Sequence, residues 1–150
     1  MAVNAYLTIA GIPGDDNGNI DLESFNWGVA NSATPCASSS QGAGSGKTTF
    51  QDFSFTSRLG SQSPQLFLKT ATGAHIPKAK LTLESDTASP ITVVFTEIVV
   101  SSYTQDLTVQ KTDTEAPSHP AEHVSFNFSS IAVTYQEQTS TFDICTGTGS

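Results

Sequence analysis

Residues 122–135 read EHVSFNFSSIAVTY, and the spacing of their apolar side chains changes partway along. Val124, Phe126 and Phe128 alternate with polar residues, as one face of a β-strand does. Two serines then follow in succession, and the alternation resumes one residue out of phase at Ile131. A strand whose inward face slips by one residue contains a bulge or crosses from one sheet to another. This stretch therefore predicts a β-strand that bends at the two serines.

A second stretch shows the same slip. In FQDFSF, residues 50–55, two polar residues separate Phe50 from Phe53, where strict alternation would place one. Bends of this kind at several strands curve a sheet into a barrel. The sequence therefore predicts a mainly β protein, folded as a closed or nearly closed β-barrel of two sheets.

Segments with period-2 alternation recur along the chain and are rich in β-branched and aromatic residues. Turn clusters and a long glycine- and serine-rich connection, about residues 31–46, separate them. The 150 residues suit one domain, 1–150, with a single core. The predicted strands are 3–10, 20–29, 47–57, 78–85, 91–103 and 123–135, with a short last one around Phe142.

One short helix is expected at about residues 63–72, flanking the barrel. Ser63 is the predicted N-cap, Pro64 occupies the first turn, and Gly73 ends the helix. A helix of this length depends on packing for its stability. The side chains expected to pack it against the barrel are Leu66, Phe67 and Ala71.

The charge balance is acidic, with 14 acidic and 6 basic side chains and a net charge of -8. This balance argues against nucleic acid or an anionic membrane surface as a partner. The acidity is concentrated after Leu83, where nine acidic residues accompany a single basic one, Lys111. Residues 1–14 contain no basic region and no long apolar run, so neither a signal peptide nor membrane insertion is expected.

Residues 38–50, SSSQGAGSGKTTF, come close to a phosphate-binding loop. The motif needs a glycine five positions before Gly46, where this chain has Gln41. It also needs a helix after the loop, whereas a strand pattern follows Lys47. We expect a glycine-rich connection and no nucleotide cofactor.

Other candidate sites are equally weak. The acidic turn GDDNGNIDLE places Ile20 where a calcium loop requires glycine, so a hairpin turn is expected. His119 and His123 are four residues apart, but Pro120 interrupts the helix that would align them. No metal site, catalytic residue or cofactor is predicted. Cys36 and Cys145 are read as reduced thiols.

Residues 46–83, GKTTFQDFSFTSRLGSQSPQLFLKTATGAHIPKAKLTL, strongly resemble the Hcp family, the tube-forming proteins of bacterial type VI secretion systems. The matching features include the Gln51 and Asp52 bulge, the Ser63–Pro64 helix start, and Gly73 followed by His75. Further matching blocks are 1–14, 20–28, 99–104 and 122–135. This sequence differs from the family pattern at 105–121 and in the last ten residues.

The resemblance implies a β-barrel with one flanking helix and six copies in a ring with an open lumen. Rings stack into a tube that a contractile sheath expels, together with a spike protein and effector cargo. It implies a structural protein with no enzymatic activity, assembled in the bacterial cytoplasm and secreted without a cleaved signal. The alternative is a secreted Hcp-like adapter or effector-binding barrel that has lost polymerisation, which the altered 105–121 segment would favour.

The resemblance also suggests where subunits meet. In the family the connection at 31–46 takes part in contacts between subunits or rings. Asn26 is assigned to a polar wall, either the lumen or the outer surface, because Phe25 and Trp27 alternate with it. The expected interface residues in and beside the connection are Cys36, Ser40, Gly42, Gly44 and Lys47.

Deleting residues 38–43 tests this assignment. The monomer should keep its melting temperature, because loops of different length change stability little. Native mass spectrometry should show fewer hexamers than the unaltered chain gives. Unchanged assembly would remove the connection from the interface.

Overall fold

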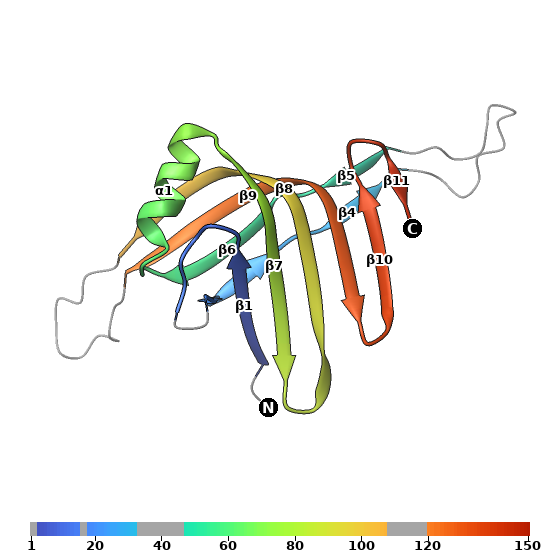
Figure 1. Ribbon diagram of the computed structural model, residues 1–150, viewed down its shortest axis with the longest axis horizontal. Coiled ribbons are helices and arrows are strands. Elements are labelled where there is room, and N and C mark those ends of the chain that lie inside the picture. The colour runs from blue at the N-terminus through green and yellow to red at the C-terminus, as the bar shows by residue number, and fades with distance from the viewer. Residues whose placement is uncertain (1–2, 16–17, 33–46, 108–119) are drawn as a thin grey trace, which may run out of the picture.

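The computed structural model describes residues 3–15, 18–32, 47–107 and 120–150. Within them the chain is mainly β, with a single short helix, as the sequence predicted (Figure 1). The strands are β1 Val3–Ile9, β2 Ile20–Asp21, β3 Ser24–Asn26, β4 Val29–Asn31, β5 Thr48–Phe50, β6 Phe53–Arg58, β7 His75–Ser85, β8 Ala88–Asp106, β9 Ala121–Tyr135, β10 Gln138–Asp143 and β11 Thr148–Gly149.

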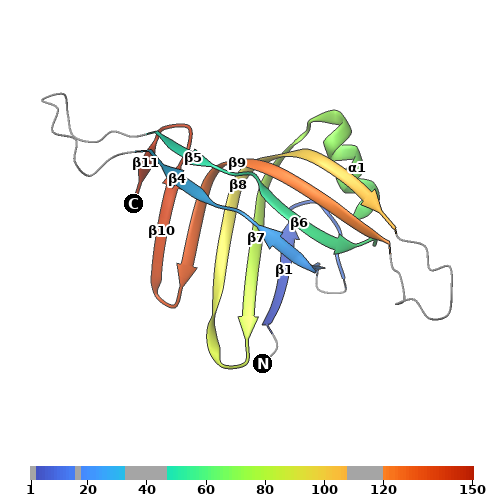
Figure 2. The ribbon, with the colours of Figure 1, turned by 180° about the vertical axis from the view of Figure 1, so that it is seen from behind.

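The main sheet is antiparallel, with the order β11-β10-β9-β8-β7-β1-β2. The long strand β9 has β8 along one side. On its other side its first half pairs with β6 and its second half with β10. β3 extends the sheet beyond β6, while β4 and β5 form a separate two-stranded ribbon (Figures 1 and 2).

Three neighbouring strands slip at the same level of the sheet, which confirms the bend predicted in β9. The buried residues Ile76, Ile98 and Phe128 lie side by side across β7, β8 and β9. After two non-buried positions in each strand, the next buried row is Ala79, Phe95 and Ile131. The pairing register is the same before and after the slip, so the three strands turn together.

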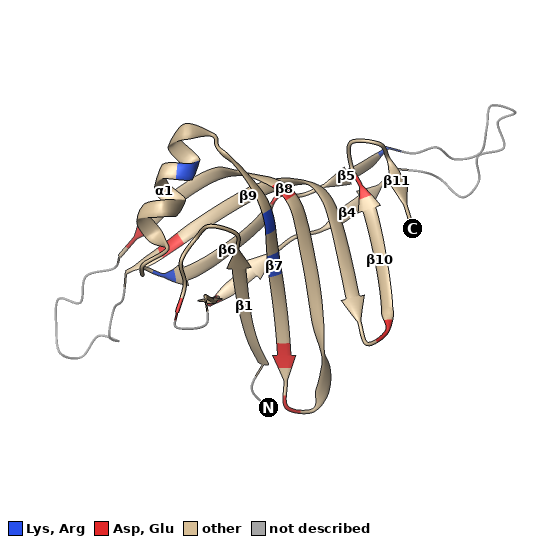
Figure 3. Ribbon diagram, in the orientation of Figure 1, with Lys and Arg blue, Asp and Glu red and all other residues tan. Residues whose placement is uncertain are grey.

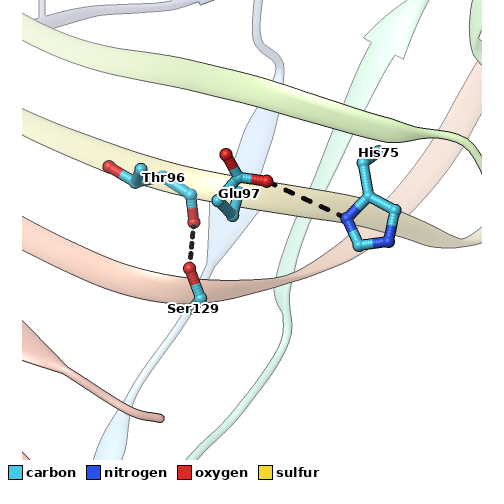
Figure 4. A network of polar contacts seen from close by, with 4 residues as sticks. All are labelled: His75, Thr96, Glu97 and Ser129. Carbon is cyan, nitrogen blue, oxygen red and sulfur yellow. Dashed lines mark hydrogen bonds and ion pairs between the residues drawn. The ribbon is translucent and has the colours of Figure 1, made fainter. Parts of the chain in front are cut away.

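Backbone strain and a polar contact mark this bend in β8 and β9. Glu97 has a φ of 50°, in the left-handed region that residues other than glycine rarely adopt. The hydroxyl of Ser129 donates to the carbonyl oxygen of Thr96 at 3.0 Å. Figure 4 shows this bond beside the exposed pair of His75 Nδ1 and Glu97 Oε2, which lie 3.9 Å apart.

The second predicted slip is also present. The chain leaves the β4–β5 ribbon at Phe50 and joins the main sheet at Phe53, with Gln51 and Asp52 exposed between them. At the same level of the sheet, on the other side of β9, β8 carries one extra residue, Ser101. Its hydroxyl contacts Asp52 Oδ2 at 2.8 Å, so the bulge is held by a side-chain hydrogen bond.

An aromatic cluster forms the centre of the core. Phe53, Phe95 and Phe126 are fully buried, with ring centroids 4.9 to 5.2 Å apart. Phe25 and Phe128 continue the cluster on either side. These rings come from four strands, so the core joins both halves of the bent sheet.

The predicted strand 20–29 is divided into β2, β3 and β4, because this segment pairs with three partners in turn. β2 pairs with β1, β3 with β6 and β4 with β5. At the first change, the amide of Leu22 donates to Ala5 O at 2.9 Å, and the next amide, of Glu23, donates to Thr56 O at 2.8 Å. No sheet is closed by strand pairing among the described residues, so the closed form of the barrel is not confirmed.

The helix α1 spans Ser63–Thr72, in agreement with the predicted range. Two details of the prediction are wrong. Gln62 is the N-cap and Ser63 is the first helical residue. The Ser63 hydroxyl donates to a buried carboxylate, which is described below. Phe67 and Ala71 are exposed, and Leu66 is the buried apolar residue of the helix. Gly73 ends α1 with a φ of 65°, as predicted.

The bend residue Glu97 should tolerate glycine. In Glu97→Gly, relief of the left-handed strain, about 1 kcal/mol, offsets the extra flexibility of glycine in the unfolded chain. The free energy of unfolding should stay within about 0.5 kcal/mol of the original in urea denaturation. Its neighbour Thr96→Gly has no strain to relieve and should lose about 1 kcal/mol. Equal losses in both variants would contradict the strain at Glu97.

Candidate assembly surfaces

An uncharged polar face covers four adjacent strands, β3, β6, β9 and β8, on the side away from the core. It consists of two cross-strand rows, which strand pairing brings into line. All eight side chains are exposed or partly exposed, while their neighbours along each strand, such as Phe55 and Val124, point into the core. The rows are Ser24, Thr56, His123, Thr104 and Asn26, Ser54, Ser125, Ser102.

Side chains of this polar face bond one another across the strands. The hydroxyls of Ser54 and Ser125 lie 2.9 Å apart, and Thr56 Oγ1 lies 3.0 Å from His123 Nδ1. A shallow depression of about 330 Å³ lies over them. The eight residues of the polar face include no lysine, arginine, aspartate or glutamate. Apart from the imidazole of His123, the face therefore offers hydrogen bonds to water but neither an ionisable group nor an apolar patch to hold another protein.

The structure places two of the predicted site residues. Asn26 is exposed at the end of one polar row, and its assignment to a wall of the lumen stays a prediction. Lys47 lies just before β5, where its amide donates to Ser32 Oγ at 2.8 Å and its carbonyl accepts the Ser32 amide at 3.2 Å. The remaining predicted residues, Cys36, Ser40, Gly42 and Gly44, lie outside the described residues.

Behind the polar face lies a buried carboxylate, that of Glu122, which is 0% exposed. Ser57 Oγ and Gln62 Nε2 donate to its Oε1 at 3.0 and 2.8 Å. Ser63 Oγ and the Tyr103 hydroxyl donate to its Oε2 at 2.7 and 2.8 Å. All four donors are uncharged, so this Glu122 cluster satisfies a buried acidic group by hydrogen bonds alone.

The Glu122 cluster attaches the start of α1 to the sheet. Gln62 and Ser63 belong to the helix N-terminus, while Ser57 and Tyr103 lie on β6 and β8. Burial is the main cause that raises the pKa of Tyr103, and its bond to Glu122 raises this pKa further. Tyr103 therefore keeps its proton at neutral pH and remains a donor to Glu122.

Charged side chains are distributed unevenly over the described residues (Figure 3). Glu84 lies near the end of β7, Asp86 lies in the β7–β8 turn, and Glu137 lies in the β9–β10 turn. Lysines lie on α1 and along the middle of β7. A face that meets another copy through both hairpin turns would bring like charges together, which is unfavourable.

Among the described residues, no group of three or more histidine, cysteine, aspartate or glutamate side chains could hold a metal ion. No helix in this part of the chain is long and apolar enough to cross a membrane. His119 lies outside it, and Cys145 is exposed and free.

Comparison with known proteins identifies the family. The sequence profile described as "Type VI secretion system effector, Hcp" matches residues 6–135. The chain belongs to the Hcp family. It is 28% identical to Protein hcp1 of Pseudomonas aeruginosa over 145 residues, which cover 92% of this chain and 86% of that protein.

Solved structures agree with this assignment. Hcp1 from Salmonella typhimurium is 25% identical to this chain. The two structures superpose over 100% of each chain with a TM-score of 0.75. A structure described as a type six secretion system protein has the same fold, with a TM-score of 0.81 at 21% identity over 99% of this chain and 100% of its own. Hcp proteins are structural, secreted tube proteins of the type VI secretion system and not an enzyme family.

Sequence reasoning missed the Glu122 cluster in this Hcp protein. Glu122 precedes the alternating run of β9 and has the same inward phase as Val124 and Phe126. That phase was a usable signal, because a charged residue at an inward position needs buried donors. The donors come from three other segments, and their meeting could not be read from spacing.

Replacing the buried carboxylate should destabilise the fold. Glu122→Ala leaves four donors without their acceptor and should lower the free energy of unfolding by about 3 kcal/mol. Glu122→Gln keeps one acceptor oxygen and should lose less. The control Glu137→Ala, in an exposed turn, should change stability by less than about 0.5 kcal/mol in the same urea titration. A loss below about 1 kcal/mol for Glu122→Ala would show that the cluster contributes little.

Proposed function

We propose that this Hcp protein forms rings of six copies, that the rings stack into a tube, and that the polar face lines the lumen. The observation that carries this proposal is the pair of uncharged polar rows across four strands. Cargo that moves through a channel must not adhere to its wall. Serine, threonine and asparagine bind water and lack the charges and large apolar groups that hold proteins together.

We infer that the barrel is closed, or nearly so, through residues 20–26. Consecutive amides in this segment donate to opposite walls, to Ala5 on β1 and to Thr56 on β6. This arrangement supports a seam made by one continuous piece of chain. A closed wall would hold the polar rows in a fixed position, as a channel lining requires.

The proposed tube needs contacts between copies of two kinds. A ring needs a head-to-tail contact that closes by rotation, and a tube needs a second one that allows further growth. We assign Lys47 and the adjoining connection, with Cys36, Ser40, Gly42 and Gly44, to these contacts. The further partners are the spike protein, the contractile sheath and effector cargo. Assembly takes place in the bacterial cytoplasm, and export follows without a cleaved signal.

Cysteine labelling tests the orientation of the polar face. Asn26→Cys and Lys80→Cys are made in a chain whose two natural cysteines are replaced by serine and whose rings are first confirmed by native mass spectrometry, because Cys36 belongs to the proposed contacts. Lys80 is exposed on β7, two strands away from β9 in the sheet. A maleimide with a bulky polyethylene glycol chain should label both cysteines in monomers. In stacked rings it should label the residue-26 variant much more slowly and the residue-80 variant at an unchanged rate.

The opposite pattern would place the polar face on the outside of the tube. Equal labelling of both variants in rings would also contradict a luminal position. Native mass spectrometry of the unlabelled chain supplies the independent check, since a persistent monomer at high concentration would overturn the ring itself.

A further inference from the structure

Two apolar surfaces of this chain lack a partner within the described residues. The first is a groove of about 370 Å³ between the β4–β5 ribbon and the inner side of β9 and β10. We call it the ribbon groove. Val29 at its rim is 54% exposed, so apolar surface is open to water there. Its main apolar lining residues are Trp27, Val29, Phe50, Ile131, Val133 and Phe142.

The second surface is the outer side of α1. Phe67 is 58% exposed and Leu68 is 51% exposed, while the preceding residue, Leu66, is fully buried. These two large apolar side chains on the outside of a ten-residue helix stay exposed in the monomer. They therefore contribute little burial free energy to folding. Aromatic side chains such as Phe67 are enriched in the buried core of protein interfaces.

These two surfaces lie at opposite ends of the molecule. In Figures 1 and 2 the helix is at one end of the long axis, and β4, β5 and β10 are at the other. One copy therefore cannot use its own helix to fill its own groove. A second copy can, and a contact between different surfaces of identical chains repeats to give a ring or a filament.

Charges beside the two surfaces match this pairing. Lys69 follows Leu68 on α1, and Asp143 follows Phe142 at the edge of the groove. Within the described residues neither forms an ion pair, and Asp143 Oδ1 accepts the Thr146 amide at 3.1 Å. The other charged residue next to a lining residue is Lys47, which precedes Thr48, so the acidic partner that the groove offers to Lys69 is Asp143.

We propose that Phe67 and Leu68 of one copy insert into the ribbon groove of the next copy, with Lys69 beside Asp143. The inference rests on the proposed ring, and it adds which surfaces form the contact between neighbouring copies. Apolar side chains supply the free energy of association, and the charge pair fixes the direction of the helix.

A mixing experiment tests the contact. Phe67→Ser with Leu68→Ser removes the helix anchors, and Val29→Asp places a charge at the rim of the groove. Each variant alone should need at least about tenfold more protein to assemble, as followed by native mass spectrometry. A mixture of the two should form a 1:1 dimer and nothing larger, because one contact per pair remains intact. The control Val3→Ser, at an exposed valine on β1, should assemble as the unaltered chain does.

The outcomes separate this inference from the proposed function. If the unaltered chain and both variants assemble equally, the contact is wrong and the ring stands. If both variants lose assembly but the mixture gives no dimer, these surfaces do not meet and the contact is again wrong. A monomeric unaltered chain overturns both proposals. Circular dichroism melting of each variant should match the unaltered monomer, which excludes unfolding as the cause.

Discussion

The common bend in β7, β8 and β9 is the constraint on which the rest of the fold depends. A slip in one strand alone would turn its apolar side chains to water beyond that point, because strand residues alternate between two faces. Here the three strands slip at paired positions, so the register is kept and both halves bury their apolar rows. The aromatic cluster then occupies the space that the bend encloses.

The position of α1 follows from the same architecture. β9 carries Glu122 beside the strand that leads into the helix, and the polar residues at the helix start satisfy its carboxylate. Since this cluster and Leu66 attach the helix to the sheet, its outer side is left without an intramolecular role. The apolar character of Phe67 and Leu68 is therefore best understood in terms of a contact with another molecule.

Local alternation in the sequence was sufficient to predict the bend, because a slip in phase is visible in residues 124–135 without any partner strand. It also predicted the helix range, since Pro64 and Gly73 mark its ends. The division of residues 20–29 was not predictable, because pairing with three different strands depends on the tertiary fold. The pattern of α1 also predicts that Phe67 packs against the barrel, because the sequence of one helix does not show how many of its residues reach the sheet. Of the candidate site, alternation with Phe25 and Trp27 points to Asn26, but the seven other residues of the polar face come together only through strand pairing.

The bond from the Ser32 amide to Lys47 O, the bond from the Lys47 amide to Ser32 Oγ, and the pairing of β4 with β5 hold together the two ends of the connection at 33–46. Each doubling in the length of such a connection costs only about 0.6 kcal/mol in loop closure. A peptide tag inserted between these two ends would therefore change the stability of the monomer little, although it would fall within the subunit contacts proposed for the connection. The bend, the Glu122 cluster and the polar rows would retain their structure when this segment is exchanged.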